Sequence, residues 1–522
     1  MRGPTAVWQA LEAARQANLR DAGVELPVAG DAGWTRRRLI ASLAALGATA
    51  ALPRQARAQG AAGPVAIIGG GIAGLTALHH LTKAGVEARL FEARTRVGGR
   101  ILTVRAPGTP VFEMGGQLVN SEHEDMHALT REFGIALIDR KTGPHRTMVL
   151  DGRAEVSRER MIAGLRPIAA QIDADSVRLD KDYATVAAEI DRMSFAGYLD
   201  LYAPLIRDPW VRRLLEATAR TEYGVEPANA SALELVFNLP AVDGRRFDVL
   251  SRSDERFQIA GGSSSLVEAM AKRHAARIVT YRRLTRVDPR GAGVRLTFSN
   301  AETFDAAAVI VTTPASIMSR VDYRVPLPDL WRRFIAEVGL GVNGKVLAAM
   351  TARPWEQPIG RGGEIWQTDP AQGVSLGWDS GVRPASGAGS VWTWFTGGKD
   401  VHAADAAEPR ALARRFAQMA EGSVPGMTAA TGPVVRRTNW HDEPFTRGAY
   451  VNFRPGQLTR FAPLIWTETN GIASVPVPAG PVVFAGEHLS DAYPGYMNGG
   501  AQTGRLAAQA IIAARAPARR RG

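Results

Sequence analysis

Near the start of the chain, apolar runs alternate with a glycine-rich stretch in an order that predicts a strand, a helix and a second strand. Residues 64–68 are almost entirely apolar, which is typical of a short parallel strand buried on both faces. Residues 75–84 have helical composition and stop at Gly85, which favours a helix that ends there. Residues 87–91 follow as a second strand. This order predicts an α/β fold.

Farther along the chain, two other patterns alternate with each other. Residues 175–192 and 210–219 are helical stretches, whereas residues 345–351 and 390–396 show the alternation of strands. We find no internal repeat and no low-complexity block. In a chain of 522 residues, these patterns fit about three domains or one large two-domain enzyme.

The first 58 residues have the features of an export signal. Three arginines, Arg36 to Arg38, precede a weakly apolar run at residues 39–52, and Ala56-Arg57-Ala58 offers a cleavage site. The run is 14 residues long, short of the roughly 20 that span a bilayer, and no other run is long enough to be an anchor. We therefore predict export of the folded protein by the twin-arginine machinery to the periplasm or medium. The alternative is an amphipathic N-terminal helix followed by a linker.

Composition and charge exclude several classes of protein. The chain has no cysteine, which excludes disulfides, iron–sulfur clusters, zinc fingers and thiol-linked cofactors. The net charge of +12 is concentrated at the ends, because residues 1–58 and residues 515–522 contribute +4 each. The remainder shows neither a basic stripe nor a nucleic-acid-binding motif, so no nucleic acid is expected as a partner.

The stretch between the first strand and the helix has the Gly-x-Gly-x-x-Gly spacing of a dinucleotide-binding turn. The first glycine permits the tight turn, the second lets a pyrophosphate approach the backbone, and the third lets helix and strand pack closely. The N-terminus of the helix then offers free N–H groups to the phosphates. An acidic residue ends the second strand, 18 residues after the last glycine, where it can bind an adenosine ribose. The predicted dinucleotide site comprises Gly69, Gly71, Ala73, Gly74 and Glu92.

Five ordered motifs between residues 64 and 514 identify the kind of dinucleotide. After the glycine-rich turn come EARTRVGGR at 92–100, EMGGQ at 113–117, ERFQI with two glycines at 255–262, LTRV at 284–287, and a closing pair at 484–487 and 495–499. Together they resemble the motifs of flavin-containing amine oxidases, of the monoamine oxidase and L-amino-acid oxidase type. The resemblance implies FAD as the cofactor.

The same resemblance assigns roles to particular residues. In that family the second arginine of the first motif neutralises pyrophosphate charge, the valine of the fourth packs on adenine, and the other motifs contact the flavin. The cofactor contacts implied here are Arg94, Arg100, Gly115, Gly116, Gln117, Val287, Trp440, Glu487 and Met497. Monoamine oxidases attach the flavin to a cysteine that precedes a tyrosine, but Ala449 stands at that position. We therefore expect non-covalent FAD.

The resemblance also implies the architecture, a doubly wound, Rossmann-like FAD/NAD(P)-binding domain with an inserted α+β substrate domain. The predicted FAD domain comprises residues 60–150, 250–325 and 435–515, the substrate domain residues 151–249 and 326–434, and a solvated basic tail residues 516–522.

Oxidation of an amine requires a dry site more than a strong acid or base. The pKa of an alkyl amine is about 10.4, so the amine arrives protonated, and an apolar, aromatic site disfavours that cation. By the family's pattern, Tyr450 and Tyr496 wall the flavin, although either could be a core tyrosine. Lys345 matches the family's lysine that holds a water against the flavin. These three are the expected catalytic residues, with O2 reduced to H2O2 and the imine hydrolysed to an aldehyde and ammonia or an amine.

Several alternatives stay open. An L-amino-acid oxidase would pair the substrate carboxylate with an arginine, and Gly115-Gly116-Gln117 lacks the arginine of that type, although Arg245, Arg246 or Arg447 could supply one. A C–C desaturase or porphyrinogen oxidase and a non-catalytic exported flavoprotein are less favoured. The electron acceptor is O2 or an electron-accepting protein. The spacing of the histidines predicts no metal site.

Overall fold

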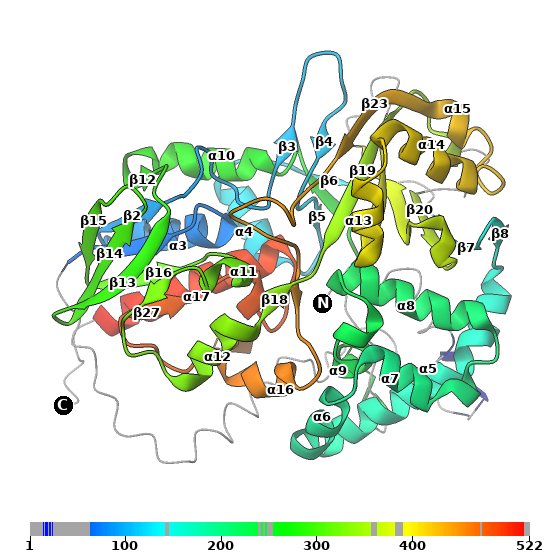
Figure 1. The fold of residues 1–522 in the computed structure, drawn as a ribbon, viewed down its shortest axis with the longest axis horizontal. Coiled ribbons are helices and arrows are strands. Elements are labelled where there is room, and N and C mark those ends of the chain that lie inside the picture. The colour runs from blue at the N-terminus through cyan, green and yellow to red at the C-terminus, as the bar shows by residue number, and fades with distance from the viewer. Residues whose placement is uncertain are drawn as a thin grey trace.

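The computed structural model describes residues 14, 16–18, 20, 21, 23, 63–140, 146–237, 242–243, 246–247, 254–356, 363–381, 390–469, 472–474 and 476–515. The predicted twin-arginine motif, apolar run, cleavage site and basic tail lie outside these residues. Figure 1 shows two lobes side by side, one built on a parallel sheet and the other on a larger mixed sheet with helices below it. Among the described helices, none is long and apolar enough to cross a membrane.

A five-stranded parallel sheet forms the centre of the first lobe. Its strands, in spatial order, are β12 (Ile278–Val279), β2 (Ala88–Phe91), β1 (Val65–Ile68), β16 (Ala308–Val311) and β27 (Val482–Phe484). Every neighbouring pair is parallel, and β1 is buried along its whole length because it lies in the middle. The sequence prediction of a strand, a helix and a second strand at this place agrees with β1, α3 (Ile72–Lys83) and β2.

Helix α3 packs against the C-terminal helix α17 (Met497–Arg515). Two glycines of α17 make this close approach possible. A Cβ on Gly504 would lie 2.1 Å from the carbonyl oxygen of Ala73, and one on Gly500 would lie 2.8 Å from Ile72 Cγ2. Neither position has room for a side chain, so the glycines fix the distance between the two helices.

An antiparallel sheet covers part of the first lobe. Its order is β15 (Thr303–Ala306), β14 (Gly293–Phe298), β13 (Leu284–Arg290) and β17 (Asp322–Tyr323), with only the β13–β17 pair parallel. Phe298 packs on Phe91 of the parallel sheet, with 4.7 Å between ring centroids. Aromatic packing of this kind joins the two sheets into one hydrophobic core.

The second lobe is organised by a seven-stranded sheet. Its order is β23 (Thr431–Arg437), β19 (Asn343–Met350), β22 (Ser390–Gly397), β21 (Leu376–Asp379), β20 (Gly363–Gln367), β7 (Arg146–Asp151) and β8 (Ala154–Glu155). Strands β19 and β22 are the two predicted from alternation, and they pair antiparallel with Lys345 opposite Phe395. Trp392 and Trp394 of β22 pack in a separate core with Phe416 of α14 (Pro409–Ala420).

Five helices form the rest of the second lobe: α5 (Arg158–Lys181), α6 (Tyr183–Asp191), α7 (Phe195–Leu201), α8 (Pro209–Tyr223) and α9 (Ala232–Phe237). The single helical stretch expected at residues 175–192 is divided between α5 and α6. Asp182 has φ −143° and accepts a hydrogen bond from the Thr185 N–H at 3.2 Å, so it ends one helix and caps the next.

Short elements connect and cover the lobes. They are β3 (Thr103–Val104), β4 (Phe112–Glu113), β5 (Leu118–Val119), α4 (Glu124–Glu132), β6 (Leu137–Asp139), β9 (Val242–Asp243), β10 (Arg246–Phe247), β11 (Phe257–Ile259), α10 (Ser264–Arg273), α11 (Ala315–Met318), α12 (Asp329–Glu337), β18 (Gly339–Leu340), α13 (Lys399–Asp405), α15 (Met427–Ala430), β24 (Val451–Asn452), α16 (Gln457–Phe461), β25 (Thr467–Thr469) and β26 (Ile472–Ser474).

Two predicted domain boundaries and one predicted segment differ from the observed arrangement. Strand β7 pairs with β20 in the second lobe, although the predicted FAD segment 60–150 includes most of it. Helix α12 packs on the first lobe, because Trp331 stacks on Phe484 with 4.4 Å between ring centroids, although the predicted substrate segment begins at residue 326. Finally, described residues within the predicted export signal pack against α5, where Asn18 donates to the Arg166 carbonyl at 2.9 Å.

Candidate active site

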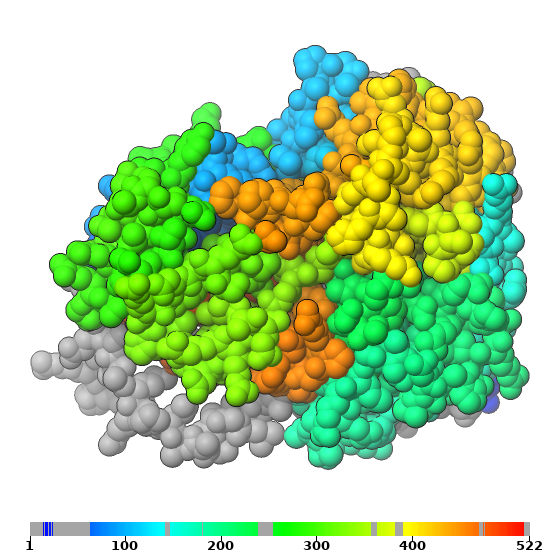
Figure 2. All heavy atoms as spheres, viewed as in Figure 1, coloured from blue at the N-terminus to red at the C-terminus, as the bar shows by residue number. Residues whose placement is uncertain are grey.

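A cavity of about 370 Å³ extends from the glycine-rich turn of the first lobe to the junction of the two lobes. The segment that follows β23 crosses this junction (Figures 1 and 2). Fourteen of the seventeen predicted site residues line the cavity: Gly69, Gly71, Ala73, Glu92, Arg94, Arg100, Gly115, Gly116, Lys345, Trp440, Tyr450, Glu487, Tyr496 and Met497. The fold therefore gathers residues from six separate segments of the chain at one place.

Two glycines of the glycine-rich turn differ in the space around them. A Cβ on Gly74 would lie 1.9 Å from the carbonyl oxygen of Gly69, so the helix and the preceding turn touch backbone to backbone. A Cβ on Gly71 would have no neighbour closer than 4.0 Å, which leaves open space beside the N-terminus of α3. Free N–H groups and the positive end of a helix dipole face that space, which is the arrangement that binds phosphate.

Glu92, at the end of β2, holds the turn from the other side. Its Oε2 accepts a hydrogen bond from the Gly70 N–H at 2.7 Å, and its Oε1 accepts one from the Arg94 N–H at 2.8 Å. The carboxylate is almost completely buried but lines the cavity. Each carboxylate oxygen has a second lone pair, so a ribose hydroxyl can still donate to it.

Two arginines of the first motif form ion pairs with distant carboxylates. Arg94 donates to Glu443 in the segment after β23, and Arg100 donates to Glu487 at 2.9 Å. Burial alone would raise the pKa of Glu487, but the charge of Arg100 and a hydrogen bond from the Gly495 N–H hold it below its usual value. Both carboxylates are therefore ionised at neutral pH, and the arginines stay in fixed positions beside the cavity.

Lys345, in β19, is buried with 7% of its surface exposed. Its Nζ donates to the carbonyls of Gly115 at 2.8 Å and Glu113 at 3.2 Å, and it lies 5.6 Å from the ring centroid of Trp378. Burial lowers the pKa of Lys345 to about 8, although the nearby charges of Glu113 and Glu255 oppose the shift. The ammonium therefore loses its proton much more readily than an exposed lysine.

The segment 113–115 is held in place through hydrogen bonds to its three successive carbonyls. Lys345 binds the first and the third, and the indole N–H of Trp440 donates to the second, that of Met114, at 2.9 Å. Both side chains come from the second lobe or its connection, so they fix a segment of the first lobe from across the junction. The cavity wall at this point is positioned by contacts between the lobes.

The two predicted tyrosines lie on different elements at the junction. The N–H of Gly341 donates to the carbonyl of Tyr450 at 2.7 Å, and the Ala449–Tyr450 peptide bond is cis. The ring of Tyr496 packs on His123 with 4.9 Å between centroids. Burial holds the pKa of His123 well below its usual value, so this imidazole is neutral and adds no charge behind the tyrosine.

Three predicted residues do not line the cavity. Gly74 serves packing, as described above. Gln117 is buried and donates to the Ser380 carbonyl at 3.2 Å. Val287 is fully buried in β13, and the residues of that region that reach the cavity are Arg282, Arg283 and Leu284. The predicted packing of Val287 on adenine is thus not supported by the lining, because the strand presents its first residues there instead.

Other cavity residues were not predicted. Thr312, Thr313 and Pro314 follow β16, and the rule that ligands bind at the carboxyl ends of parallel strands could have found them. Phe395 lies opposite Lys345 in the sheet, and the hydroxyl of Thr446 accepts a hydrogen bond from Arg94 at 2.6 Å. Neither has a local sequence signal, because each depends on pairing between distant segments.

The residues present fit FAD. The lining combines an open glycine cradle, a buried ribose-binding carboxylate and several arginines, which suit a dinucleotide with two phosphates. His488 also lines the cavity, and neither of its ring nitrogens has a hydrogen-bond partner among the described residues. Burial lowers the pKa of His488 to about 4, so at neutral pH the uncharged ring offers one donor and one acceptor to an occupant. Fold and site together define an FAD-dependent oxidoreductase.

Comparisons with known proteins agree with this class. The profile of the family described as "Flavin containing amine oxidoreductase" matches residues 72–512, so the chain belongs to that family. The protein is therefore an FAD-dependent enzyme that oxidises amines. Over 86% of its length it is 25% identical to a flavin-containing amine oxidase of Oncorhynchus mykiss, of which it covers 85%. Over 90% of its length it is 25% identical to a nicotine dehydrogenase of Pseudomonas putida, of which it covers 94%.

Solved structures show the same fold. Cyclohexylamine oxidase from Brevibacterium oxydans superposes with a TM-score of 0.72 at 22% sequence identity, over 86% of this chain and 99% of that one. Putrescine oxidase bound to putrescine superposes with a TM-score of 0.70 at 21% identity, with the same coverage.

Proposed function

We propose that the protein oxidises an amine that carries no α-carboxylate, with O2 as the electron acceptor and H2O2 as the second product. The amine carbon–nitrogen bond becomes an imine, which water hydrolyses to an aldehyde and ammonia or a smaller amine. The observation that carries the proposal is the chemistry of the cavity beside Tyr450 and Tyr496, where aromatic rings and Lys345 supply the functional groups.

The arginines of the described cavity lining are already committed or lie elsewhere. Arg94 and Arg100 form ion pairs with Glu443 and Glu487. The other three are Arg282, Arg283 and Arg320. The backbone N–H of Arg282 donates to the Glu92 carbonyl, at the ribose end, and the carbonyl of Arg283, the next residue, accepts from the Ser299 N–H. Arg320 lies two residues before β17, which pairs with β13. A substrate carboxylate beside the tyrosines would therefore have no described arginine to pair with.

Of the three arginines that sequence analysis offered to an amino-acid substrate, only Arg447 has a described side chain. Arg447 is exposed and does not line the cavity. Arg246 begins the short strand β10, but its side chain, like Arg245, is outside the described part of the chain. The substrate assay below tests their contribution directly.

The chain's own residues bind, orient and desolvate the amine. Bound FAD supplies the acceptor for the two electrons and the hydrogen removed from the carbon beside nitrogen. Tyr450 and Tyr496 form an aromatic slot that favours the neutral amine over its ammonium form. Lys345 holds a positive charge, fixed by two carbonyls, in the cavity lining, where it would stabilise negative charge on bound reduced flavin and assist the reaction with O2.

Similar proteins support this reading of the substrate. Two enzymes with similar solved structures, putrescine oxidase and cyclohexylamine oxidase, act, by their names, on amines without a carboxylate. The similar nicotine dehydrogenase bears the name of a dehydrogenase, which favours an electron-accepting protein as the second candidate acceptor.

The experiment compares amines with the amino acids from which they derive by loss of CO2, such as phenethylamine with phenylalanine and tyramine with tyrosine. Anaerobic bleaching of the flavin measures reduction, and peroxide release in air measures the acceptor. We expect kcat/KM to be at least a hundredfold higher for the amines, with one H2O2 per amine. Faster bleaching by the amino acids would overturn the substrate assignment. Rapid bleaching without peroxide would assign the electrons to a protein acceptor.

We also propose that FAD is held non-covalently. Ala449 lines the cavity directly before Tyr450, and the chain contains no cysteine that could form a thioether. Denaturation in acid should release all the flavin into the supernatant, whereas flavin that remains in the washed precipitate would contradict the proposal.

Export by the twin-arginine route is the remaining part of the proposal. It rests on Arg36 and Arg37 before the apolar run and on a cofactor that must be inserted before export. Replacing both arginines by lysine should retain flavin-loaded protein in the cytoplasm, with the wild type in the periplasm or medium. Equal distribution of the two proteins would rule out the route.

A further inference from the structure

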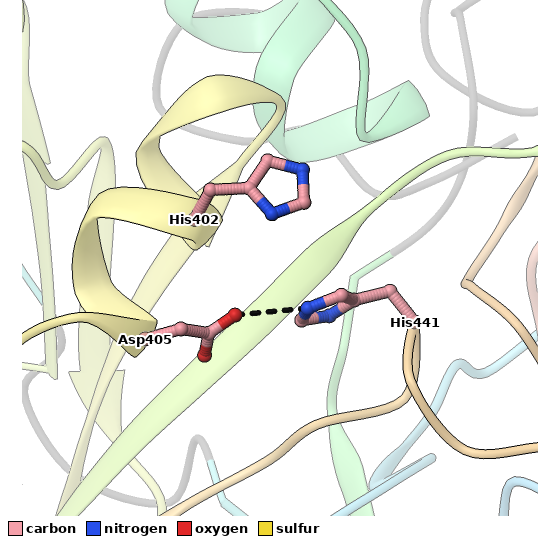
Figure 3. A group of neighbouring side chains, drawn as sticks. All are labelled: His402, Asp405 and His441. Carbon is pink, nitrogen blue, oxygen red and sulfur yellow. Dashed lines mark ion pairs between the residues drawn. The ribbon is translucent and has the colours of Figure 1, made fainter.

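Two histidines and an aspartate meet on the second lobe, outside the cavity. His402 and Asp405 lie three residues apart on α13, so they share one face of that helix. His441 lies four residues beyond the end of β23, in the segment that crosses the junction. One nitrogen or oxygen atom of each residue lies within 4.8 Å of the others. Figure 3 shows the three side chains turned toward a common space.

The geometry of the cluster suits a metal ion. His441 Nε2 lies 2.8 Å from Asp405 Oδ2, and the rings of His402 and His441 are nearly perpendicular with 5.3 Å between centroids. Ligand atoms bound to one tetrahedral ion lie roughly 3–4 Å apart, because each metal–ligand bond is about 2.0–2.2 Å. Small rotations of these side chains would reach that geometry. Two imidazoles and one carboxylate are a donor set that Zn²⁺ accepts.

Burial differs across the cluster in a way that leaves one position open. The His441 side chain is 10% exposed, the Asp405 side chain is 24% exposed, and His402 is exposed. A metal ion here would be anchored on the buried side and open to water on the other. Such a site can load from solution in the folded protein, without unfolding.

The charges that face the cluster favour a bound cation. Asp442 Oδ2 lies 3.8 Å from His441 Nε2 and adds a second carboxylate. Arg437 Nε lies 3.5 Å from Asp405 Oδ1 and opposes a cation. However, Arg437 Nη1 donates to the carbonyls of Ala404 and Ala407 at 2.6 Å and 2.9 Å, so the guanidinium is directed at the end of α13. The two carboxylates together outweigh its single positive charge.

A second histidine cluster shows why the arrangement matters. His79 Nδ1 lies 3.1 Å from His274 Nε2, but His79 Nε2 faces Glu132 at 3.0 Å, so no single atom of His79 faces both partners. Lys83 and Arg273 also pair with Glu132 there. That cluster has histidines and a carboxylate without a common centre, and it serves as a natural negative control.

We propose that His402, Asp405 and His441 form a three-ligand site for a divalent transition-metal ion of the Zn²⁺ type, with water completing the coordination. The ion would join α13 to the segment that carries Trp440, whose indole holds the Met114 carbonyl at the cavity wall. Binding should therefore stabilise the contact between the lobes.

The test is titration of the FAD-loaded, chelator-treated enzyme with Zn²⁺ by isothermal calorimetry, beside His402→Gln and Asp405→Asn. His402 is exposed and outside the cavity, so the first variant should fold and retain flavin. We expect one Zn²⁺ per chain in the wild type and at least a tenfold higher Kd in each variant. His80→Gln, on α3 away from the cluster, should bind as the wild type does.

A spectroscopic measurement identifies the ligands. Electron paramagnetic resonance of the enzyme with one equivalent of Cu²⁺ should show coupling to two imidazole nitrogens in the wild type and in His80→Gln, and to one in His402→Gln. Zn²⁺ should also raise the Tm of the wild type but not that of His402→Gln. Equal affinity and equal spectra in wild type and His402→Gln would overturn the proposal, as would weaker binding after His274→Gln alone.

Discussion

The two lobes use their residues in opposite ways. In the parallel-sheet lobe, the cavity is shaped by contacts to the backbone within a short piece of chain, such as Gly74 against the Gly69 carbonyl and the Glu92 carboxylate against the Gly70 N–H. In the mixed-sheet lobe, single side chains reach across the junction, as Lys345 does to a carbonyl 230 residues away. We therefore expect the first lobe to determine whether a cofactor is held and the second to determine how the bound substrate reacts.

The largest expected effect is the loss of stability that distinguishes Gly74→Ala from Gly71→Ala in the same turn. In Gly74→Ala, the new Cβ would lie 1.9 Å from a backbone carbonyl that cannot move aside, so we expect a loss of at least about 3 kcal/mol of unfolding free energy. In Gly71→Ala, the Cβ meets nothing within 3.9 Å and the fold should survive, but a methyl group would stand where the pyrophosphate approaches.

Two measurements distinguish these outcomes. Urea unfolding of the flavin-free proteins should give a normal midpoint for Gly71→Ala and a strongly lowered one for Gly74→Ala. The flavin-to-protein absorbance ratio should fall in both. A Gly71→Ala protein that keeps full FAD occupancy would show that the cofactor does not approach the turn.

An effect of similar size concerns the ion pair of Arg100 and Glu487. Arg100→Met leaves a buried carboxylate without its cation, and breaking a buried pair costs about 3–5 kcal/mol. Because the native pKa of Glu487 lies below its usual value, the pair stabilises the protein at neutral pH, and this stabilisation is lost as pH falls through the native pKa. The stability difference between wild type and variant should therefore be full at pH 7 and shrink below about pH 4.3.

Unfolding of the flavin-free proteins at several pH values measures that difference. The variant should also lose FAD on gel filtration. Arg105→Met removes an exposed arginine that pairs with Glu268, and it serves as the matched control with little expected change. A pH-independent difference would mean that Arg100 acts through packing and not through its charge.

The contrast between the lobes also explains what the sequence could predict. The strand, turn, helix and acidic residue of the first lobe lie within 28 consecutive residues, and local rules for glycine and capping apply to them directly. Four predicted residues of this stretch, Gly69, Gly71, Ala73 and Glu92, consequently line the cavity, and the family's motifs located the other ten. The expected contact of Val287 with adenine is not supported by the lining, because its strand reaches the cavity at Leu284, which depends on packing between two sheets.

Contacts across the junction could not be predicted from local pattern. Arg94 and Glu443 are 349 residues apart, and Trp440 and Met114 are 326 apart. His402 and Asp405 show a helical spacing in the sequence, but their meeting with His441 requires β23 to lie beside α13. Such pairs leave no local pattern in the sequence, because they form only where the two lobes meet. By contrast, the family's motifs already locate Lys345, Tyr450 and Tyr496.

Lys345→Met tests the second lobe. It should keep yellow, bound flavin but slow reoxidation by O2 by about a hundredfold, the usual effect of removing one electrostatic contact from a reacting site. Lys399→Met, at an exposed lysine of α13, is the matched control and should reoxidise normally. Stopped-flow absorbance after anaerobic reduction measures both. Unchanged reoxidation in Lys345→Met would remove the lysine from the oxygen reaction.

Lys345→Met should also change how the stability of the protein depends on pH. Burial lowers the native pKa of Lys345 to about 8, whereas an unfolded lysine titrates near about 10.4. Between these values the unfolded chain binds a proton that the native protein has released, so wild-type stability should rise with pH relative to Lys345→Met. A flat difference between pH 8 and pH 10 would contradict the lowered pKa.

The smallest expected effect, and the most specific to the second lobe, is that of Tyr450→Leu. Leucine keeps the wall apolar but removes the flat ring that narrows the slot, so kcat/KM for the amine should fall ten- to hundredfold, or about 1.4–2.7 kcal/mol of transition-state stabilisation. FAD content should hardly change, and Tyr450→Phe, which keeps the ring, should remain close to wild type. In the wild type, flavin reduction should rise with pH with an apparent pKa below that of the free amine, because the slot admits the neutral form. If Tyr450→Leu instead lost flavin or unfolded, the tyrosine would belong to the core of the junction, and the division of labour between the lobes would fail at this residue.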